Sequence, residues 1–89
     1  MITRTIVIKN KLGLHARAAS KLVEVALSYS AKIEIGHSEN LVNCKSIMSV
    51  LMLAAGKGTE LSVRAQGEDE AEAVEAIVAL IDNLFGEAE

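Results

Sequence analysis

The chain has 89 residues and a formal net charge of −3, and it is 51% hydrophobic but only 2% aromatic. This length fits a single domain, residues 1–89, that buries one hydrophobic core. The acidic balance and the scarcity of aromatic side chains exclude the basic surface and the base-stacking platforms that are typical of nucleic-acid-binding proteins.

The chain carries one cysteine, Cys44. An internal disulfide is therefore excluded, and a reducing compartment is favoured. No apolar run is long enough to span a membrane, and residues 1–9 lack the pattern of a secretory signal. We expect a cytoplasmic protein that has neither a membrane nor a nucleic acid as its partner.

Hydrophobic periodicity predicts four strands and three helices in the order βαββαβα. The first and last strands alternate apolar and polar residues, whereas residues 18–27 repeat apolar residues at the spacing of a helix with one buried face. Ser46 is expected to cap the second helix, and Phe85 to lie on the buried face of the third. In chain order, the elements are expected at residues 2–9, 18–27, 32–36, 41–44, 47–55, 60–65 and 69–85.

Glycines are expected to end two of the helices. Gly56 and Gly58 follow the second helix, and Gly86 follows the third. Four strands with helices on one face form a two-layer α+β fold, an open-faced sandwich. One face of its sheet packs against the helices, and the other meets solvent.

A histidine, His15, stands where a strand has ended and a helix is about to begin. The first turn of a helix offers unpaired backbone N–H groups and the positive end of the helix dipole, which together bind anions. Histidine is also a covalent nucleophile. The position suggests a histidine that carries a phosphoryl group, whose charge the N–H groups of Ala16 and Arg17 and the Arg17 guanidinium compensate. The spacing fits equally well a loop histidine that serves only as a helix cap.

Other groups that could take part in chemistry are few. We expect no second acid–base group to pair with His15, which favours a phosphoryl carrier over a complete enzyme. His15, His37 and Cys44 show no spacing typical of a metal site, and Cys44 is interpreted as a small core residue. Neither a metal nor a cofactor is expected.

The second helix suggests a regulated docking surface. A phosphate on Ser46 would lie next to a helix N-terminus, where it is tolerated, and would act on whatever docks nearby. Apolar residues surround nearly the whole helix, although a two-layer fold buries only one side of it. Ile47, Met48 and Leu51 form one stripe, which we interpret as an adaptable apolar docking patch, the alternative being a helix that is simply well buried.

Several motifs, together with the order of the elements, resemble the HPr family, the histidine phosphocarriers of the bacterial phosphoenolpyruvate-dependent phosphotransferase system. The resemblance covers essentially the whole chain and implies four antiparallel strands in the spatial order 1-4-2-3 with three helices on one face. The motifs are Gly13-Leu14-His15-Ala16-Arg17, Lys45-Ser46-Ile47-Met48 and Gly67-Glu68-Asp69-Glu70.

The resemblance also implies roles for single residues. His15 matches the histidine that enzyme I phosphorylates on Nδ1, and Arg17 matches the arginine that helps to bind and release the phosphoryl group. Ser46 matches the serine that a dedicated kinase phosphorylates in some bacteria. The stripe from Ile47 to Leu51 matches the surface on which enzyme I and the IIA proteins dock. We expect a monomer.

One position departs from the family pattern. Proline usually follows the arginine, whereas this chain has Ala18, which restores an N–H donor and loosens the segment. The family serves both sugar uptake and a regulatory branch, and the sequence does not distinguish them. An alternative from another class is a regulatory interaction module that docks through the helix after Ser46 without turning over phosphate.

Overall fold

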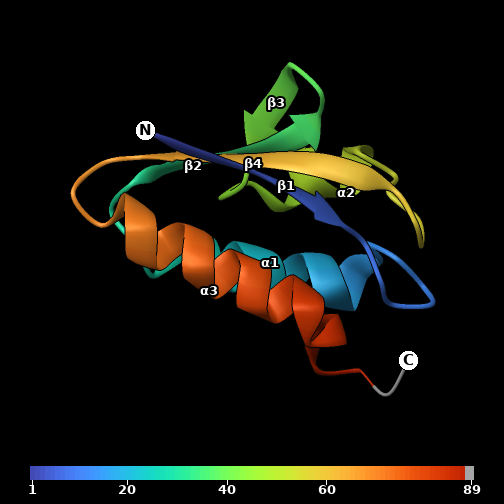
Figure 1. Cartoon of the computed structure of the whole chain (residues 1–89). Coiled ribbons are helices and arrows are strands. Elements are labelled where there is room, and N and C mark those ends of the chain that lie inside the picture. The colour runs from blue at the N-terminus through green and yellow to red at the C-terminus, as the bar shows by residue number, and fades with distance from the viewer. Residues whose placement is uncertain (88–89) are drawn as a thin grey trace.

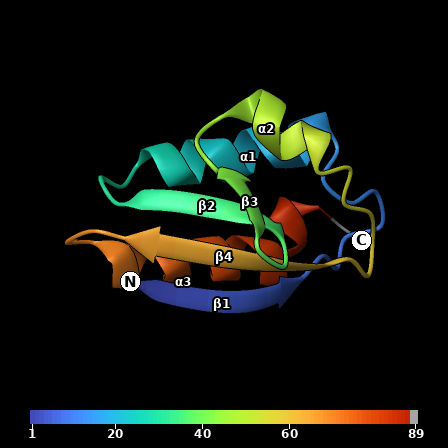
Figure 2. The ribbon, with the colours of Figure 1, turned by 90° about the horizontal axis from the view of Figure 1, so that it is seen from above.

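The central feature of the computed structural model, which describes residues 1–87, is an antiparallel sheet. Over these residues, four strands lie in the order β1-β4-β2-β3. Figure 1 shows α1 and α3 next to each other beneath the sheet, and Figure 2 shows α2 beside α1. The elements are β1 (Ile2–Val7), α1 (Ala16–Leu27), β2 (Lys32–His37), β3 (Asn40–Asn43), α2 (Ile47–Met52), β4 (Glu60–Gln66), α3 (Glu70–Asp82) and the 3₁₀ turn η1 (Leu84–Gly86).

The predicted two-layer α+β fold and strand order are confirmed. Strand β4 shows why the alternation was informative, because Leu61, Val63 and Ala65 are buried while the residues between them are not. Their side chains point from one face of the sheet toward the helices, as the period of two along a strand requires. Strand β4 pairs with β1 on one side and with β2 on the other.

Helices α1 and α3 each bury one stripe against the sheet. Alanines form most of the stripe on α1, whereas the stripe on α3 consists mainly of larger, β-branched side chains. Burial of these apolar surfaces supplies the main driving force for folding. The buried helical residues are Ala18, Ala19, Leu22 and Ala26 in α1, and Ala73, Val74, Ile77 and Ile81 in α3.

Helix α2 is shorter than predicted, since it ends at Met52 rather than at residue 55. The chain leaves the helix at Ala54, which has a φ of 51°, before it reaches either glycine. The carbonyl of Ala55 then accepts a hydrogen bond from Leu14 N at 2.8 Å. Tertiary contact with the loop before α1 therefore determines where this segment goes, and the prediction that Gly56 and Gly58 end the helix is wrong.

Helix α3 also ends early, at Asp82, and Phe85 does not belong to it. Leu84 and Phe85 have φ values of 57° and 55°, so the chain reverses direction in a short 3₁₀ turn. Phe85 is nevertheless fully buried. Its side chain reaches the core through this turn rather than from the face of a continuous helix, which corrects the prediction.

Cys44 is buried in the core and is not in a disulfide. Burial raises the pKa of its thiol to about 12, since a thiolate is poorly solvated among apolar side chains. The interpretation of Cys44 as a small core residue is confirmed. Within residues 1–87, no helix has the length and apolar character needed to cross a bilayer.

Candidate functional site

The site is built around the loop that joins β1 to α1. Gly13 has a φ of 68°, a conformation that L residues rarely adopt, and its N–H donates to the Asn10 carbonyl at 3.2 Å. Leu14, which is buried, donates its N–H to the Ala55 carbonyl. The loop is therefore held against the segment that follows α2, and this contact positions the next residue, His15.

His15 is the residue at the N-terminal boundary of α1. Its backbone is extended, with φ −76° and ψ 176°, and its carbonyl accepts the first helical hydrogen bond, from Ala19 N at 2.8 Å. Its side chain makes no capping hydrogen bond. His15 therefore occupies the N-cap position through its backbone alone, and its half-buried imidazole takes no part in capping the helix.

The two residues after His15 lie in the first turn of α1. Ala16 and Arg17 are the first two residues of the helix, so no earlier helical carbonyl is available to accept a hydrogen bond from their N–H groups. Arg17 is exposed, and its guanidinium makes no hydrogen bond or ion pair with any residue in the range 1–87. The N–H groups, the helix dipole and this guanidinium can together compensate an anion beside the imidazole.

A carboxylate, Glu87, pairs with the imidazole, contrary to the expectation that His15 has no acid–base partner. The distance between His15 Nε2 and Glu87 Oε2 is 2.5 Å. The other carboxylate oxygen, Oε1, accepts a hydrogen bond from Asn10 Nδ2 at 2.8 Å. The prediction failed because the partner lies 72 positions away in the chain.

Asn10 and Lys21 are further residues of this site that sequence reasoning missed. Asn10 is fully buried, and its Nδ2 also donates to the Gly13 carbonyl at 2.8 Å. Lys21 Nζ donates to the Phe85 carbonyl at 2.7 Å, two residues before Glu87. The one signal that distinguishes Asn10 is that it is polar and yet buried, and burial of a loop residue cannot be inferred from a sequence pattern.

Charge and hydrogen bonding favour an ionised Glu87. The hydrogen bond from Asn10, above all, holds the pKa of Glu87 below its usual range, and the hydrogen bond from His15 and the positive charge of Lys21 act in the same direction. Partial desolvation opposes these effects. At neutral pH, the imidazole therefore faces a carboxylate rather than a carboxylic acid.

Ser46 is the residue before α2 and caps it as predicted. Its Oγ accepts a hydrogen bond from Ser49 N at 3.4 Å, and its carbonyl accepts one from Val50 N at 3.0 Å. Ser46 is half-buried, and its hydroxyl lies beside the first turn of α2.

The apolar stripe on α2 differs in part from the expected one. Met48 and Ile47 are exposed, to 65% and 37%, whereas Leu51 packs against the core and is only partly accessible. Met52, which was not assigned to the stripe, is 80% exposed. Leu12, in the loop before α1, is also exposed. Helix α2 thus presents an apolar surface, but Met52 contributes more to it than Leu51 does.

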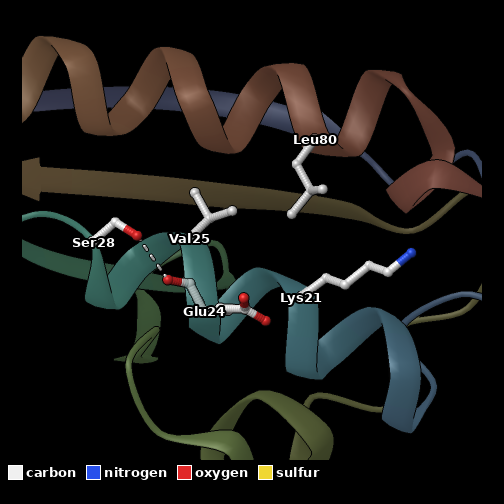
Figure 3. Close-up of a pocket in the computed structure, with 5 residues that line it drawn as sticks. All are labelled: Lys21, Glu24, Val25, Ser28 and Leu80. Atoms are coloured by element: carbon white, nitrogen blue, oxygen red, sulfur yellow. Dashed lines mark hydrogen bonds between the residues drawn. The ribbon is translucent and has the colours of Figure 1, made fainter.

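A shallow groove of about 340 Å³ lies between α1 and α3, apart from the imidazole. Figure 3 shows that Lys21, Val25 and Glu24 line it from α1, and Leu80 from α3. The side chain of Lys21 extends along the groove toward the turn after α3, where it meets the Phe85 carbonyl (Figure 3). Among residues 1–87, no three histidine, cysteine or acidic side chains are grouped to hold a metal ion.

The fold and this site define a class of protein, a small open-faced α+β domain that presents a histidine at the start of its first helix. Residues 2–83 match the family described as "PTS HPr component phosphorylation site". Phosphocarrier protein HPr of Pseudomonas aeruginosa is 55% identical over 85 residues, which is 94% of each chain. The chain belongs to the HPr family of phosphocarriers of the phosphotransferase system.

Solved structures agree with this assignment. The crystal structure of HPr-C-His from Thermoanaerobacter tengcongensis is 43% identical, covers 100% of both chains and superposes with a TM-score of 0.95. A structure described as an HPr dimer from the same organism is 44% identical, covers 98% of this chain and 100% of that one, and has a TM-score of 0.78.

Proposed function

We propose that this chain accepts a phosphoryl group on His15 from enzyme I and passes it to a IIA protein. The observation that carries the proposal is the position of the imidazole, which precedes the first turn of α1 and is not used as a helix cap. The membership of the chain in the HPr family supports the same donor and acceptor. The whole chain would act as one carrier domain.

The chemistry needs little from the carrier beyond charge compensation. The imidazole attacks the phosphorus of the donor, and the electron pair of the breaking bond stays with the donor's leaving atom. Negative charge on the phosphoryl oxygens is then compensated by the N–H groups of Ala16 and Arg17 and by the Arg17 guanidinium. Donor and acceptor proteins supply the alignment.

Intact-protein mass spectrometry tests the proposal, after the chain is mixed with enzyme I and phosphoenolpyruvate. We expect one acid-labile phosphate on the wild type and on His37→Ala, and none on His15→Ala. His37 is a matched control because it is the other histidine and lies outside the site. Labelled His15→Ala would exclude His15 as the acceptor, and an unlabelled wild type with active enzyme I would favour a regulatory interaction module.

Arg17 is proposed to compensate charge rather than to accept the phosphoryl group. Arg17→Ala should therefore still become phosphorylated, but more slowly, as measured by rapid quenching. Arg17→Lys keeps the positive charge and loses the planar fork, so it separates the effect of charge from that of geometry. A normal rate in Arg17→Ala would show that the backbone N–H groups suffice.

The second helix is proposed as the docking and control surface. Enzyme I and IIA proteins would dock on Ile47, Met48 and Leu51, and Met52 is exposed beside them. A serine kinase would phosphorylate Ser46 and weaken docking by adding charge next to this surface. We further propose that the carrier acts as a monomer in the cytoplasm, where its free Cys44 would stay reduced.

A further inference from the structure

Two features position Glu87: the turn after α3 and a hydrogen bond from Asn10. After α3, the left-handed residues Leu84 and Phe85 reverse the chain, at a cost of about 1–2 kcal/mol for each. Full burial of Phe85 and the hydrogen bond from Lys21 to its carbonyl hold this turn in place. The turn therefore directs the next residues back to the loop before α1, where the Glu87 carboxylate contacts His15.

Asn10 orients the carboxylate of Glu87. Its Nδ2 carries two protons, and these go to Gly13 O and Glu87 Oε1, each at 2.8 Å. The opposite orientation of the amide would place Oδ1 against a carbonyl and a carboxylate, so the two acceptors fix the orientation shown. Asn10 is fully buried, and its Oδ1 has no hydrogen-bond partner among the residues that the structure describes. A buried polar atom without a partner costs free energy, so this amide is retained at some expense.

We propose that Glu87 is the positioning residue for the histidine that accepts the phosphoryl group. Its carboxylate holds the ring proton on Nε2 and fixes the plane of the imidazole, so that Nδ1 presents its lone pair as the nucleophile. This inference rests on the proposed function of His15 and on Nδ1 as the reacting atom, which the family resemblance implies, and it adds the residue that holds the ring so that this atom can react.

The chemistry of the two groups supports the assignment. A carboxylate only accepts hydrogen bonds, so the 2.5 Å contact places a proton on Nε2 of the ring. A neutral imidazole carries one ring proton, and Nδ1 is then unprotonated. Among residues 1–87, Nδ1 has no hydrogen-bond partner. Buried or partly buried carboxylates orient histidines in the same way in catalytic triads and beside metal-bound histidines.

Bonds and charges are accounted for in the phosphoryl transfer when the ring proton is on Nε2. The lone pair of Nδ1 forms the N–P bond while the bond between phosphorus and the donor's leaving atom breaks, and that electron pair leaves with the donor. The proton stays on Nε2, and the ring acquires positive charge, which the carboxylate of Glu87 stabilises. When the phosphoryl group moves on to an acceptor, the N–P electron pair returns to Nδ1, and the ring leaves as neutral imidazole.

The first arm of the test reads the tautomer without any phosphoryl donor. ¹⁵N NMR of the neutral His15 ring should show the Nε2–H form in the wild type and in Asp82→Asn, and a mixture of both forms in Glu87→Gln. Asp82→Asn is the matched control. It removes the same charge near the end of α3, but from a carboxylate that pairs with Lys9. A ring that stays entirely Nε2–H in Glu87→Gln would overturn the inference.

The second arm measures the rate of phosphoryl acceptance from enzyme I by rapid quenching. We expect Glu87→Gln to be about 10–100-fold slower, as for other partners that orient a functional histidine, and Asp82→Asn to match the wild type. Equal rates in Glu87→Gln and Asp82→Asn would overturn the positioning role while leaving His15 as the acceptor. A wild type that accepts no phosphate would overturn the proposed function, and the tautomer measurement would still test whether Glu87 positions the ring.

Discussion

Gly13 and Ala55 are in contact through their backbones. A Cβ built on Gly13 would lie 2.4 Å from the Ala55 carbonyl oxygen, and the residue has a φ of 68°. The neighbouring Leu14 N donates to that same carbonyl. The loop that carries His15 and the segment that follows α2 therefore meet at a point where there is room for a hydrogen atom but not for a Cβ.

We predict from this contact that Gly13→Ala destabilises the fold. Both the positive φ and the clash with a backbone atom act against alanine, and together they should lower the free energy of unfolding by about 2–4 kcal/mol. Gly56→Ala is the matched control, since a Cβ there would have no atom of residues 1–87 within 4 Å outside its chain neighbours. Urea denaturation of both variants measures the difference, and equal stability would contradict the close approach.

Stability should also depend on pH through Asp69. Hydrogen bonds from Ser30 N and Ala31 N, both at 2.8 Å, and from the Ser30 hydroxyl lower the pKa of Asp69 from its ordinary value of 3.8. The unfolded chain therefore binds this proton more readily than the folded one. The stabilising contribution is fully present above the ordinary pKa and is lost as the pH falls through the folded value.

The measurement is the free energy of unfolding of the wild type and Asp69→Asn between about pH 5 and pH 2. Wild type should lose more stability on acidification than Asp69→Asn does. Glu72→Gln is the control, because it removes the same charge from an exposed position in the first turn of α3. Parallel curves for the wild type and Asp69→Asn would show that these hydrogen bonds form equally well to the protonated acid.

Local pattern was enough to predict the layers and one half of the site. Leu61, Val63 and Ala65 alternate because one face of β4 is buried, and this signal is contained within a single strand. His15 could likewise be placed, since the change from a strand period to a helix period marks the start of α1. Both inferences depend only on residues that are close together in the chain.

The other half of the site depends on a contact that no local pattern contains. Glu87 reaches His15 only because Leu84 and Phe85 take left-handed conformations that neither residue type favours. Burial of Phe85 overrides that preference. The same contact explains why the predicted end of α3 is too late: Phe85 has the spacing of a helical core residue, but it fills the core from the turn.

Ser46 offers a test that separates the helix cap from the proposed regulation. Ser46→Ala removes the acceptor for Ser49 N and should lower the free energy of unfolding by about 0.5–1 kcal/mol, at the weak end for a cap because the bond is 3.4 Å long. Ser46→Asp keeps an acceptor and adds a negative charge. It should therefore fold as stably as the wild type.

Phosphoryl acceptance from enzyme I distinguishes the two Ser46 variants further. Ser46→Asp should accept the group more slowly, with the effect in KM for the carrier, because the charge lies beside the apolar surface of α2. Ser46→Ala should keep the wild-type KM. Unchanged kinetics in Ser46→Asp would mean that a charge at this position does not affect docking.

Ala18 should accept the proline that the family usually has at its position. It lies in the first turn of α1, where its N–H has no helical partner, so proline removes no hydrogen bond. Ala18→Pro should raise the free energy of unfolding by about 0.4–1 kcal/mol by restricting the unfolded chain. Ala19→Pro, one residue on, is the contrasting variant, because Ala19 N donates to the His15 carbonyl at 2.8 Å. It should be destabilised by about 3 kcal/mol. Because Ala18 is fully buried, a loss of stability in Ala18→Pro would show that the core leaves no room for the ring.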